Sequence, residues 1–202
     1  MIVEFILTLS LSLPSSVSDV GPLLTQIDFA EPVQEVVTYP SVGVENRLSG
    51  LQLPDETLTA YETDFLADTV FFGAFAITKD FGYGYVTGAN SLEAAREIAI
   101  EECLKQGPIC LVYAEILPQG YAPLEAGQIS LAPEAAGYFD NPDPTWGSFR
   151  AMAVSEDGAY SVVWGYGSPS EASAAALSDC GEFVIDDLPN LREMPCILVP
   201  FK

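Results

Sequence analysis

Acidic side chains, four cysteines and a few clustered aromatic residues are the groups of this 202-residue sequence that could do chemistry, and histidine is absent. Without histidine there is no Ser-His-Asp or Cys-His triad, no His-ligated catalytic metal and no ready acid/base for neutral pH. The adjacent pairs Glu101/Glu102 and Asp186/Asp187 suggest a glycosidase dyad. However, sequence neighbours point in different directions and give no sign of carboxyl groups held about 5 to 9 Å apart. We therefore interpret both pairs as solvated.

Two motifs resemble ligand-binding loops but miss their requirements. Asp140, Asn141 and Asp143 resemble a fragment of a calcium loop, but they lack its regular alternation and distal Glu, so we expect turn residues. The segment GYGYVTG at 82–88 has the spacing GxGxxxG and lies before the predicted helix. It is expected to be a strand with glycines, not a phosphate cradle. We predict no cofactor and no metal site.

An internal repeat organises the elements that must position these groups. Residues 72–103 reappear without a gap 77 positions later as residues 149–180, with eleven identical pairs in 32 positions. A fixed period defines the structural unit of a fold. We predict an α+β fold of two β-β-α-β repeats, each with a helix packed on a small, mostly antiparallel sheet.

The elements of each repeat follow from local patterns. Residues 71–78 and 83–87 are β-compatible runs around a turn, and an Ala- and Glu-rich helix begins after Ser91. Residues 168–171, Ser-Pro-Ser-Glu, carry a capping box with Pro at the first helical position. Alanines at helical spacing predict close packing on the sheet. An apolar run at 110–117 or 196–201 is expected to be the last strand.

The rest of the chain is expected to lie outside the repeats. Residues 1–18 resemble a signal peptide, although Glu4 interrupts the apolar run and no positive residue precedes it; a mis-chosen start codon or a buried segment are the alternatives. Residues 19–69 are rich in Pro and acids and predict a poorly ordered lead-in, with partial strand order around 33–39. We assign 70–120 to the first repeat, 121–147 to a linker and 148–202 to the second repeat.

The four cysteines occupy matched places in the two repeats. Cys103 and Cys180 end the predicted helices, and Cys110 and Cys196 begin the last strands. Four cysteines allow three pairings, and the matched placement favours pairing within each repeat. Free thiols are the alternative, whereas a zinc site does not fit the spacings. Disulfides indicate an oxidising compartment, so we expect a periplasmic or secreted protein.

Aromatic residues on the second strand of each repeat are the candidate binding surface. Tyr83 and Tyr85 point to one face, and Tyr160 and Trp164 lie on the matching face of the second repeat. If the helix covers the other face, these rings lie on an open sheet surface, as is typical of recognition. The alternative is that this face packs against the other repeat or the linker. The longer loop 181–195, which contains Asp186 and Asp187, is the second place where specificity is expected.

The first repeat resembles a family of small secreted bacterial domains of unknown function. The resemblance rests on FGAFA at 72–76, the G-x-x-S-x-x-x-A run at 88–95, Cys103 and Cys110, and the second repeat departs from it at Arg150 and in its longer cysteine loop. The tandem arrangement is similar to that of relatives in alphaproteobacteria, some of which carry an aminolevulinate-synthase label. That activity needs a Schiff-base lysine, and Lys79, Lys105 and Lys202 have no suitable setting. The resemblance implies no established activity or cofactor.

The net charge of the sequence limits the classes of partner that it can bind. The sequence has 29 acidic and seven basic residues, a net charge of −22, and no basic cluster, so nucleic acid and anionic membranes are poor partners. The acidity indicates either a solubilising surface or docking to a basic partner. Apart from the first residues, no run approaches a membrane span, so stable membrane insertion is not expected. We predict a non-enzymatic binding protein for a protein or envelope polymer. A carboxylate-dependent envelope glycan hydrolase and a purely structural or inhibitory protein are the alternatives.

Overall fold

The computed structural model describes residues 35–40, 42–67 and 70–201. All of these residues belong to one compact unit, Pro32–Lys202. The predicted signal peptide at 1–18 and the lead-in up to residue 34 therefore lie outside the described residues. No helix in the described part is long and apolar enough to cross a bilayer.

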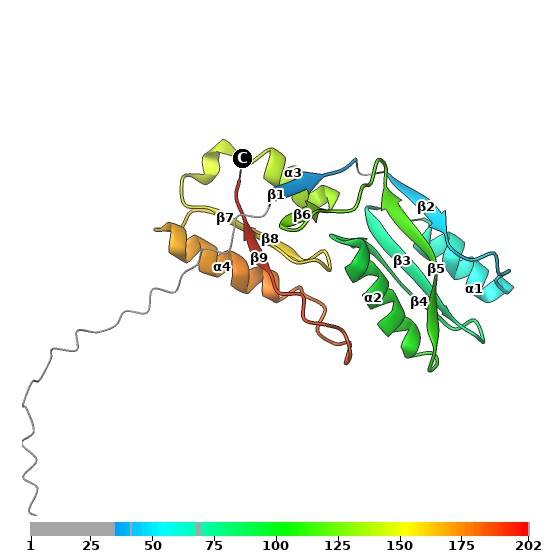
Figure 1. The fold of residues 1–202 in the computed structure, drawn as a ribbon. Coiled ribbons are helices and arrows are strands. Elements are labelled where there is room, and N and C mark those ends of the chain that lie inside the picture. Colours follow the sequence, from blue (N-terminus) through cyan, green and yellow to red (C-terminus); the bar gives the residue numbers. More distant parts are fainter. Residues whose placement is uncertain (1–34, 41, 68–69, 202) are drawn as a thin grey trace, which may run out of the picture. The chain divides into compact units, whose positions relative to one another are not determined.

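The first repeat has the predicted β-β-α-β order. Its elements are β3 (Phe72–Thr78), β4 (Tyr83–Ala89), α2 (Leu92–Leu104) and β5 (Cys110–Pro118) (Figure 1). The strands pair antiparallel in the order β2-β5-β3-β4, where β2 (Gly43–Arg47) comes from the predicted lead-in. Helix α2 begins after Ser91, whose hydroxyl accepts a hydrogen bond from the Ala94 N–H at 3.0 Å. The cap satisfies one of the N–H groups that a helix leaves unpaired.

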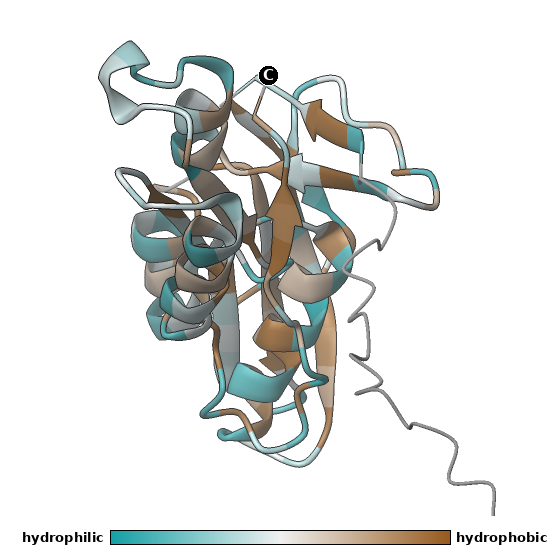
Figure 2. Cartoon of the chain, turned by 90° about the vertical axis from the view of Figure 1, so that its left-hand side faces the viewer, coloured by the Kyte–Doolittle hydropathy of each residue, from teal (hydrophilic) through white to brown (hydrophobic). Residues whose placement is uncertain are grey.

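Small residues let α2 lie close to the sheet, as the alanine spacing predicts. Ala95, Ala99 and Cys103 of α2 are fully buried in one cluster with Ala74 and Ala76 of β3. A Cβ added at Gly84 would stand 2.5 Å from the carbonyl carbon of Glu102 and would also overlap the backbone of Cys103. The glycine of the GYGYVTG segment is therefore explained by the approach of a helix, not by phosphate binding. Figure 2 shows hydrophilic and hydrophobic segments mixed along the helical ribbons.

The other face of the first sheet is covered by residues of the predicted lead-in. Helix α1 (Asp55–Ala60) runs into a π-helical turn, η1 (Tyr61–Phe65). Tyr61 and Phe65 are fully buried against Phe75 and Tyr113. The expectation of a poorly ordered lead-in is therefore wrong for residues 35–66, apart from the undescribed residue 41. Only a few residues of α1 and η1 are buried, and the exposed residues of both elements are mostly acidic. The acidic composition of this segment therefore suggested disorder.

The second repeat repeats the order of the first with shorter strands. It consists of β7 (Ala151–Val154), β8 (Tyr160–Val163), α4 (Pro169–Gly181) and β9 (Ile197–Val199), with strand order β8-β7-β9. The predicted capping box is confirmed at its first half, because the Ser168 hydroxyl accepts from the Glu171 N–H at 3.2 Å and Pro169 is the first helical residue. The α+β prediction is confirmed.

The predicted linker between the repeats is structured. It contains β6 (Gln128–Leu131), α3 (Pro133–Asp140) and the short 3-10 helix η2 (Pro144–Trp146). Strand β6 pairs parallel with β1 (Glu35–Thr38), which confirms strand order near residues 33–39. Leu131 and Phe139 pack with Met152 of β7 on the sheet face away from α4. The interpretation of 121–147 as a linker is wrong, because this segment supplies the second layer of the core of the second repeat.

A buried asparagine joins the two repeats. The Asn90 side chain, 0% exposed, donates to the Ser155 carbonyl at 2.7 Å and accepts from the Ala132 N–H at 2.6 Å. Its backbone N–H donates to the Glu156 carbonyl at 2.9 Å, and its carbonyl accepts from the Ser130 hydroxyl. The side chain and backbone of this one residue thus connect the end of β4 to the end of β6 and to the β7–β8 turn.

Both disulfides close within a repeat, as the matched placement favours. Cys103 pairs with Cys110 and Cys180 with Cys196, at Cα–Cα distances of 6.1 and 6.2 Å. Each bridge ties the end of a helix to the last strand of its sheet. The chain is therefore a disulfide-stabilised protein, a type that is common in oxidising compartments.

Candidate functional site

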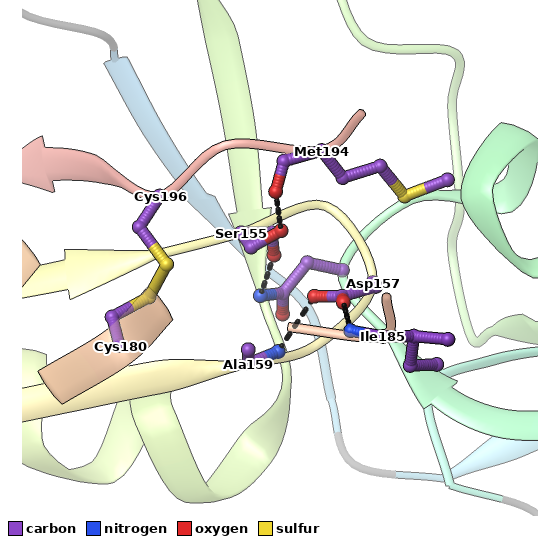
Figure 3. Close-up of a disulfide and its surroundings, with 8 residues drawn as sticks. Ser155, Asp157, Ala159, Cys180, Ile185, Met194 and Cys196 are labelled. Atoms are coloured by element: carbon purple, nitrogen blue, oxygen red, sulfur yellow. Dashed lines mark hydrogen bonds between the residues drawn. A yellow bond between two sulfur atoms is a disulfide. The ribbon is translucent and has the colours of Figure 1, made fainter. Parts of the chain in front are cut away.

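Two hydrogen bonds hold the loop between Cys180 and Cys196 against the β7–β8 turn. Ser155 donates its hydroxyl proton to the Met194 carbonyl at 2.7 Å. The buried Asp157 carboxylate accepts from the Ile185 N–H at 2.7 Å (Figure 3). Both anchoring side chains come from the β7–β8 turn, beside the disulfide.

Part of this loop serves to join the repeats. Leu188 and Met194 are buried against Ala94 and Ile98 of α2. Arg192 forms ion pairs with Glu97, at 2.9 Å, and with Glu156. This loop is nine residues longer than its counterpart in the first repeat. Its added length serves largely to pack on the first repeat.

The two adjacent acidic residues of this loop are solvated. Asp186 and Asp187 are both exposed, which agrees with their interpretation as solvated. No described cluster of three or more acidic or cysteine side chains has the arrangement of a metal site. These two residues add negative charge to the surface.

The aromatic residues of the first repeat do not lie on an open face. Tyr83 and Tyr85 point away from α2, as predicted, and both stack on Phe75, with ring centroids 5.4 and 6.1 Å apart. Tyr85 also contacts Phe65 of η1 edge-on at 6.2 Å. The expectation of an open aromatic surface is wrong for this sheet, because α1 and η1 cover it.

The corresponding face of the second repeat is open at one edge. A cavity of about 480 Å³ runs beside β8, and we call it the aromatic cleft. Its lining consists of four aromatic side chains and the strand itself: Tyr138, Gly158, Ala159, Tyr160, Ser161, Val162, Trp164 and Phe183. On this face Met152 and Val154 of β7 are buried, whereas Tyr160 and Val162 of β8 are only partly buried. The predicted residues Tyr160 and Trp164 therefore lie together in one cleft.

Three rings of the aromatic cleft are exposed, and that of Trp164 is held in place by a ring stack. Trp164 is 50% exposed and stacks on the nearly buried Trp146 at 4.9 Å, with an interplanar angle of 13°. Tyr138 lies 6.1 Å from both Trp146 and Tyr160. Phe183, at the start of the cysteine loop, is 68% exposed. Such stacking limits the rotamers of Trp164 while leaving one face of its ring free for a ligand.

The second repeat places a carboxylate beside the aromatic cleft, and its described arginines contact other groups. Burial and a hydrogen bond to Glu134 raise the pKa of Tyr160 above its ordinary value, so this phenol stays protonated at neutral pH. Arg150 lies over the Phe201 ring, with its guanidinium carbon 5.1 Å from the centroid. Arg192 is held by Glu97 and Glu156. Both arginines of the described second repeat are thus engaged.

A second cavity, of about 430 Å³, lies at the junction of the repeats. Glu93, Arg96 and Glu156 line it together with apolar residues of both repeats. Arg96 binds the buried carboxylate of Glu115 at 2.6 Å. Glu156 pairs with Arg192 and accepts a long hydrogen bond from Ser91 at 3.4 Å. The charged groups of this junction cleft are therefore mostly bound to one another.

Three aromatic residues of the aromatic cleft and its ring stack were not predicted from the sequence. Tyr138 and Trp146 lie in the predicted linker, and Phe183 lies in the cysteine loop. A signal for α3 was present, since Pro133 at the first helical position and Glu134 in the first turn are typical of a helix start. Comparison of the chain with family models, curated proteins and solved structures found no match.

Proposed function

We propose that this protein is a non-enzymatic binding protein, exported to the periplasm or secreted, whose ligand site is the aromatic cleft of the second repeat. The observation that carries the proposal is Trp164, half exposed on the cleft and fixed by its stack on Trp146. Tryptophan and tyrosine dominate binding hot spots, and a preorganised ring loses little freedom when a partner binds. The two disulfides support the oxidising compartment.

We assign the ligand to one chemical class, a cationic segment of a partner polypeptide. The chain carries a net charge of −22, which attracts basic partners and repels acidic ones. The exposed faces of Trp164 and Tyr138 attract Arg and Lys side chains through cation–π interactions. Glu134, hydrogen-bonded to Tyr160, places a carboxylate near the same cleft.

The test is a binding assay with defined peptides. The probes are fluorescent heptapeptides in which Arg or Lys alternates with Val, Phe or Trp, and a matched set in which Glu replaces the basic residues. We expect binding of the basic set alone. Trp164→Ala should weaken it by at least about tenfold, which is the range of a hot-spot residue. Leu111→Ala is the matched control, because Leu111 is an exposed apolar residue of the first repeat.

Two results would overturn this assignment. Equal binding of the basic and acidic peptides, or no binding of either, would refute the cationic ligand. Binding of neutral envelope oligosaccharides in its place, with the same loss in Trp164→Ala, would assign the cleft to a glycan. The assignment to the secreted domain family that the first repeat resembles is likewise a proposal, and it makes no prediction about the ligand.

A carboxylate-dependent glycan hydrolase is the second candidate. The observation that favours it is the presence of Glu93 and Glu156 on the junction cleft. The ion pair of Glu156 with Arg192 favours a structural role for this carboxylate. Release of reducing ends from purified peptidoglycan by the wild-type protein, lost in both Glu93→Gln and Glu156→Gln, would establish hydrolysis.

A further inference from the structure

Strand β8 forms one edge of its sheet, because the order β8-β7-β9 gives it a single neighbour. A turn hydrogen bond from the Ser155 N–H to the Ala159 carbonyl, at 2.8 Å, fixes the phase of its pairing with β7. Hydrogen-bonded and non-hydrogen-bonded positions alternate along an antiparallel pair. Since Ser161 lies opposite Ala153, Ser161 bonds to β7. The backbone groups of its neighbours Tyr160 and Val162 therefore point away from the sheet.

Apart from its length of four residues, this edge lacks, among the described residues, the features that usually protect a strand. Proteins blunt open edges with Pro, Lys, bulges or a covering segment. The sequence of β8 is YSVV, and its register with β7 is regular. Within the described ranges, no strand or turn residue pairs with the outer side of β8. Two N–H and two C=O groups, from Tyr160 and Val162, are thus available to an extended chain.

The aromatic cleft follows the same edge. Its lining includes the consecutive residues 158–162. Side chains alternate between the two faces of a strand, so Ser161 points opposite to Tyr160 and Val162. A cavity that touches all three residues must run along the side of the strand rather than lie on one face. A segment placed there can contact both the backbone of β8 and the rings of the cleft.

We propose that the partner segment binds by strand addition, as a fourth strand of the sheet beside β8. This inference rests on the proposed function, since it names the conformation in which the cationic segment occupies the aromatic cleft. The outward N–H groups of Tyr160 and Val162 donate to carbonyls of the segment, and their carbonyls accept its N–H groups. Alternate side chains of the segment then enter the cleft, where an Arg or Lys side chain meets the face of Trp164.

Proline at position 162 tests the backbone contact in the protein. Val162→Pro removes one outward N–H and no bond to β7, and proline is tolerated on an edge strand in this orientation. We expect the basic heptapeptides to bind at least tenfold more weakly to Val162→Pro, and within threefold of wild type to Val162→Ala. Similar affinities of the two variants would overturn strand addition. Urea unfolding of both variants reports whether the proline variant keeps its fold.

N-methylated peptides give a second test that leaves the protein unchanged. Two isomers of a bound heptapeptide carry methyl groups on alternate backbone nitrogens, one set on odd and one on even positions. Strand addition predicts that one isomer loses at least tenfold in affinity and the other stays within threefold, because only alternate N–H groups face β8. Equal affinities of both isomers and the parent would refute it.

The same experiments separate this inference from the proposed function. If Trp164→Ala abolishes binding while neither the methyl groups nor Val162→Pro has an effect, the cleft is the ligand site and strand addition is wrong. If Trp164→Ala has no effect on binding, the cleft is not the site and both proposals fail. Loss of binding with Trp164→Ala, Val162→Pro and one methylated isomer supports both.

Discussion

Replacing Asn90 by Ala is expected to destabilise the protein more than any substitution of an exposed polar residue. The change leaves the Ala132 N–H without its partner, and the Ser155 carbonyl keeps only the Gly158 N–H, at 3.3 Å. An unsatisfied buried polar group costs about 1 to 3 kcal/mol. The orphaned Ala132 N–H and the hydrogen bond lost by the Ser155 carbonyl together give a loss of about 2 to 4 kcal/mol in the free energy of unfolding, a large share of the roughly 5 to 15 kcal/mol typical of native proteins.

The assay is urea unfolding of the oxidised protein, followed by fluorescence of its two tryptophans and by circular dichroism. The matched control is Asn190→Ala, because Asn190 also bridges the repeats but is exposed, with its amide 3.1 Å from a Glu101 oxygen. We expect a loss below about 1 kcal/mol for the control. A loss below about 1 kcal/mol for Asn90→Ala as well, at unchanged urea dependence, would refute the reasoning that this buried network joins the repeats.

Three further predictions concern the disulfides, helix packing and pH. Replacing Cys180 and Cys196 by Ser should lower the free energy of unfolding, measured in urea, by about 3 kcal/mol. The same change at Cys103 and Cys110, which close a shorter loop, should lower it by about 2.5 kcal/mol. The reverse order would contradict the loop-entropy reasoning. Gly84→Ala should destabilise the protein by about 2 to 3 kcal/mol, because the added Cβ forces α2 away from the sheet. Gly137→Ala, whose Cβ would lie in open space on α3, should stabilise the protein by up to about 1 kcal/mol. Equal thermal midpoints of the two variants would contradict the close approach of α2 to β4. Burial and a hydrogen bond to Glu45 raise the pKa of Tyr61 above its ordinary value of about 10, so its contribution to stability is complete below pH 10 and is lost as pH rises toward the folded-state pKa. Tyr61→Phe should weaken the decline in stability above pH 10 in urea titrations, and an unchanged decline would show that other groups cause it.

Local signals in the sequence account for the repeated scaffold. The capping residues Ser91 and Ser168 mark where helices begin, and alanine at helical spacing marks the face that meets the sheet. These signals depend on neighbours within one or two turns, so they can be recognised without knowledge of the fold. The cysteine placement likewise favoured the disulfide pairing that is observed.

Contacts between distant segments decided the rest. Tyr83/Tyr85 and Tyr160/Trp164 occupy matching faces, yet α1 and η1 cover the first pair while the second lies beside a cleft. No local pattern distinguishes these outcomes, because exposure depends on which segment packs above the sheet.

The amino-acid sequence by itself determined two β-β-α-β units with one aromatic strand face each and favoured a disulfide within each unit, since periodicity, caps and cysteine placement are local signals. Only the tertiary structure decided that the segment before the first unit buries one of these faces. It also decided that α3 and η2 bring Tyr138 and Trp146 to the other face, and that the long cysteine loop packs on α2. The physical reason is that short, partly acidic elements gain stability mainly from the surfaces they cover, and those surfaces lie far away in the sequence.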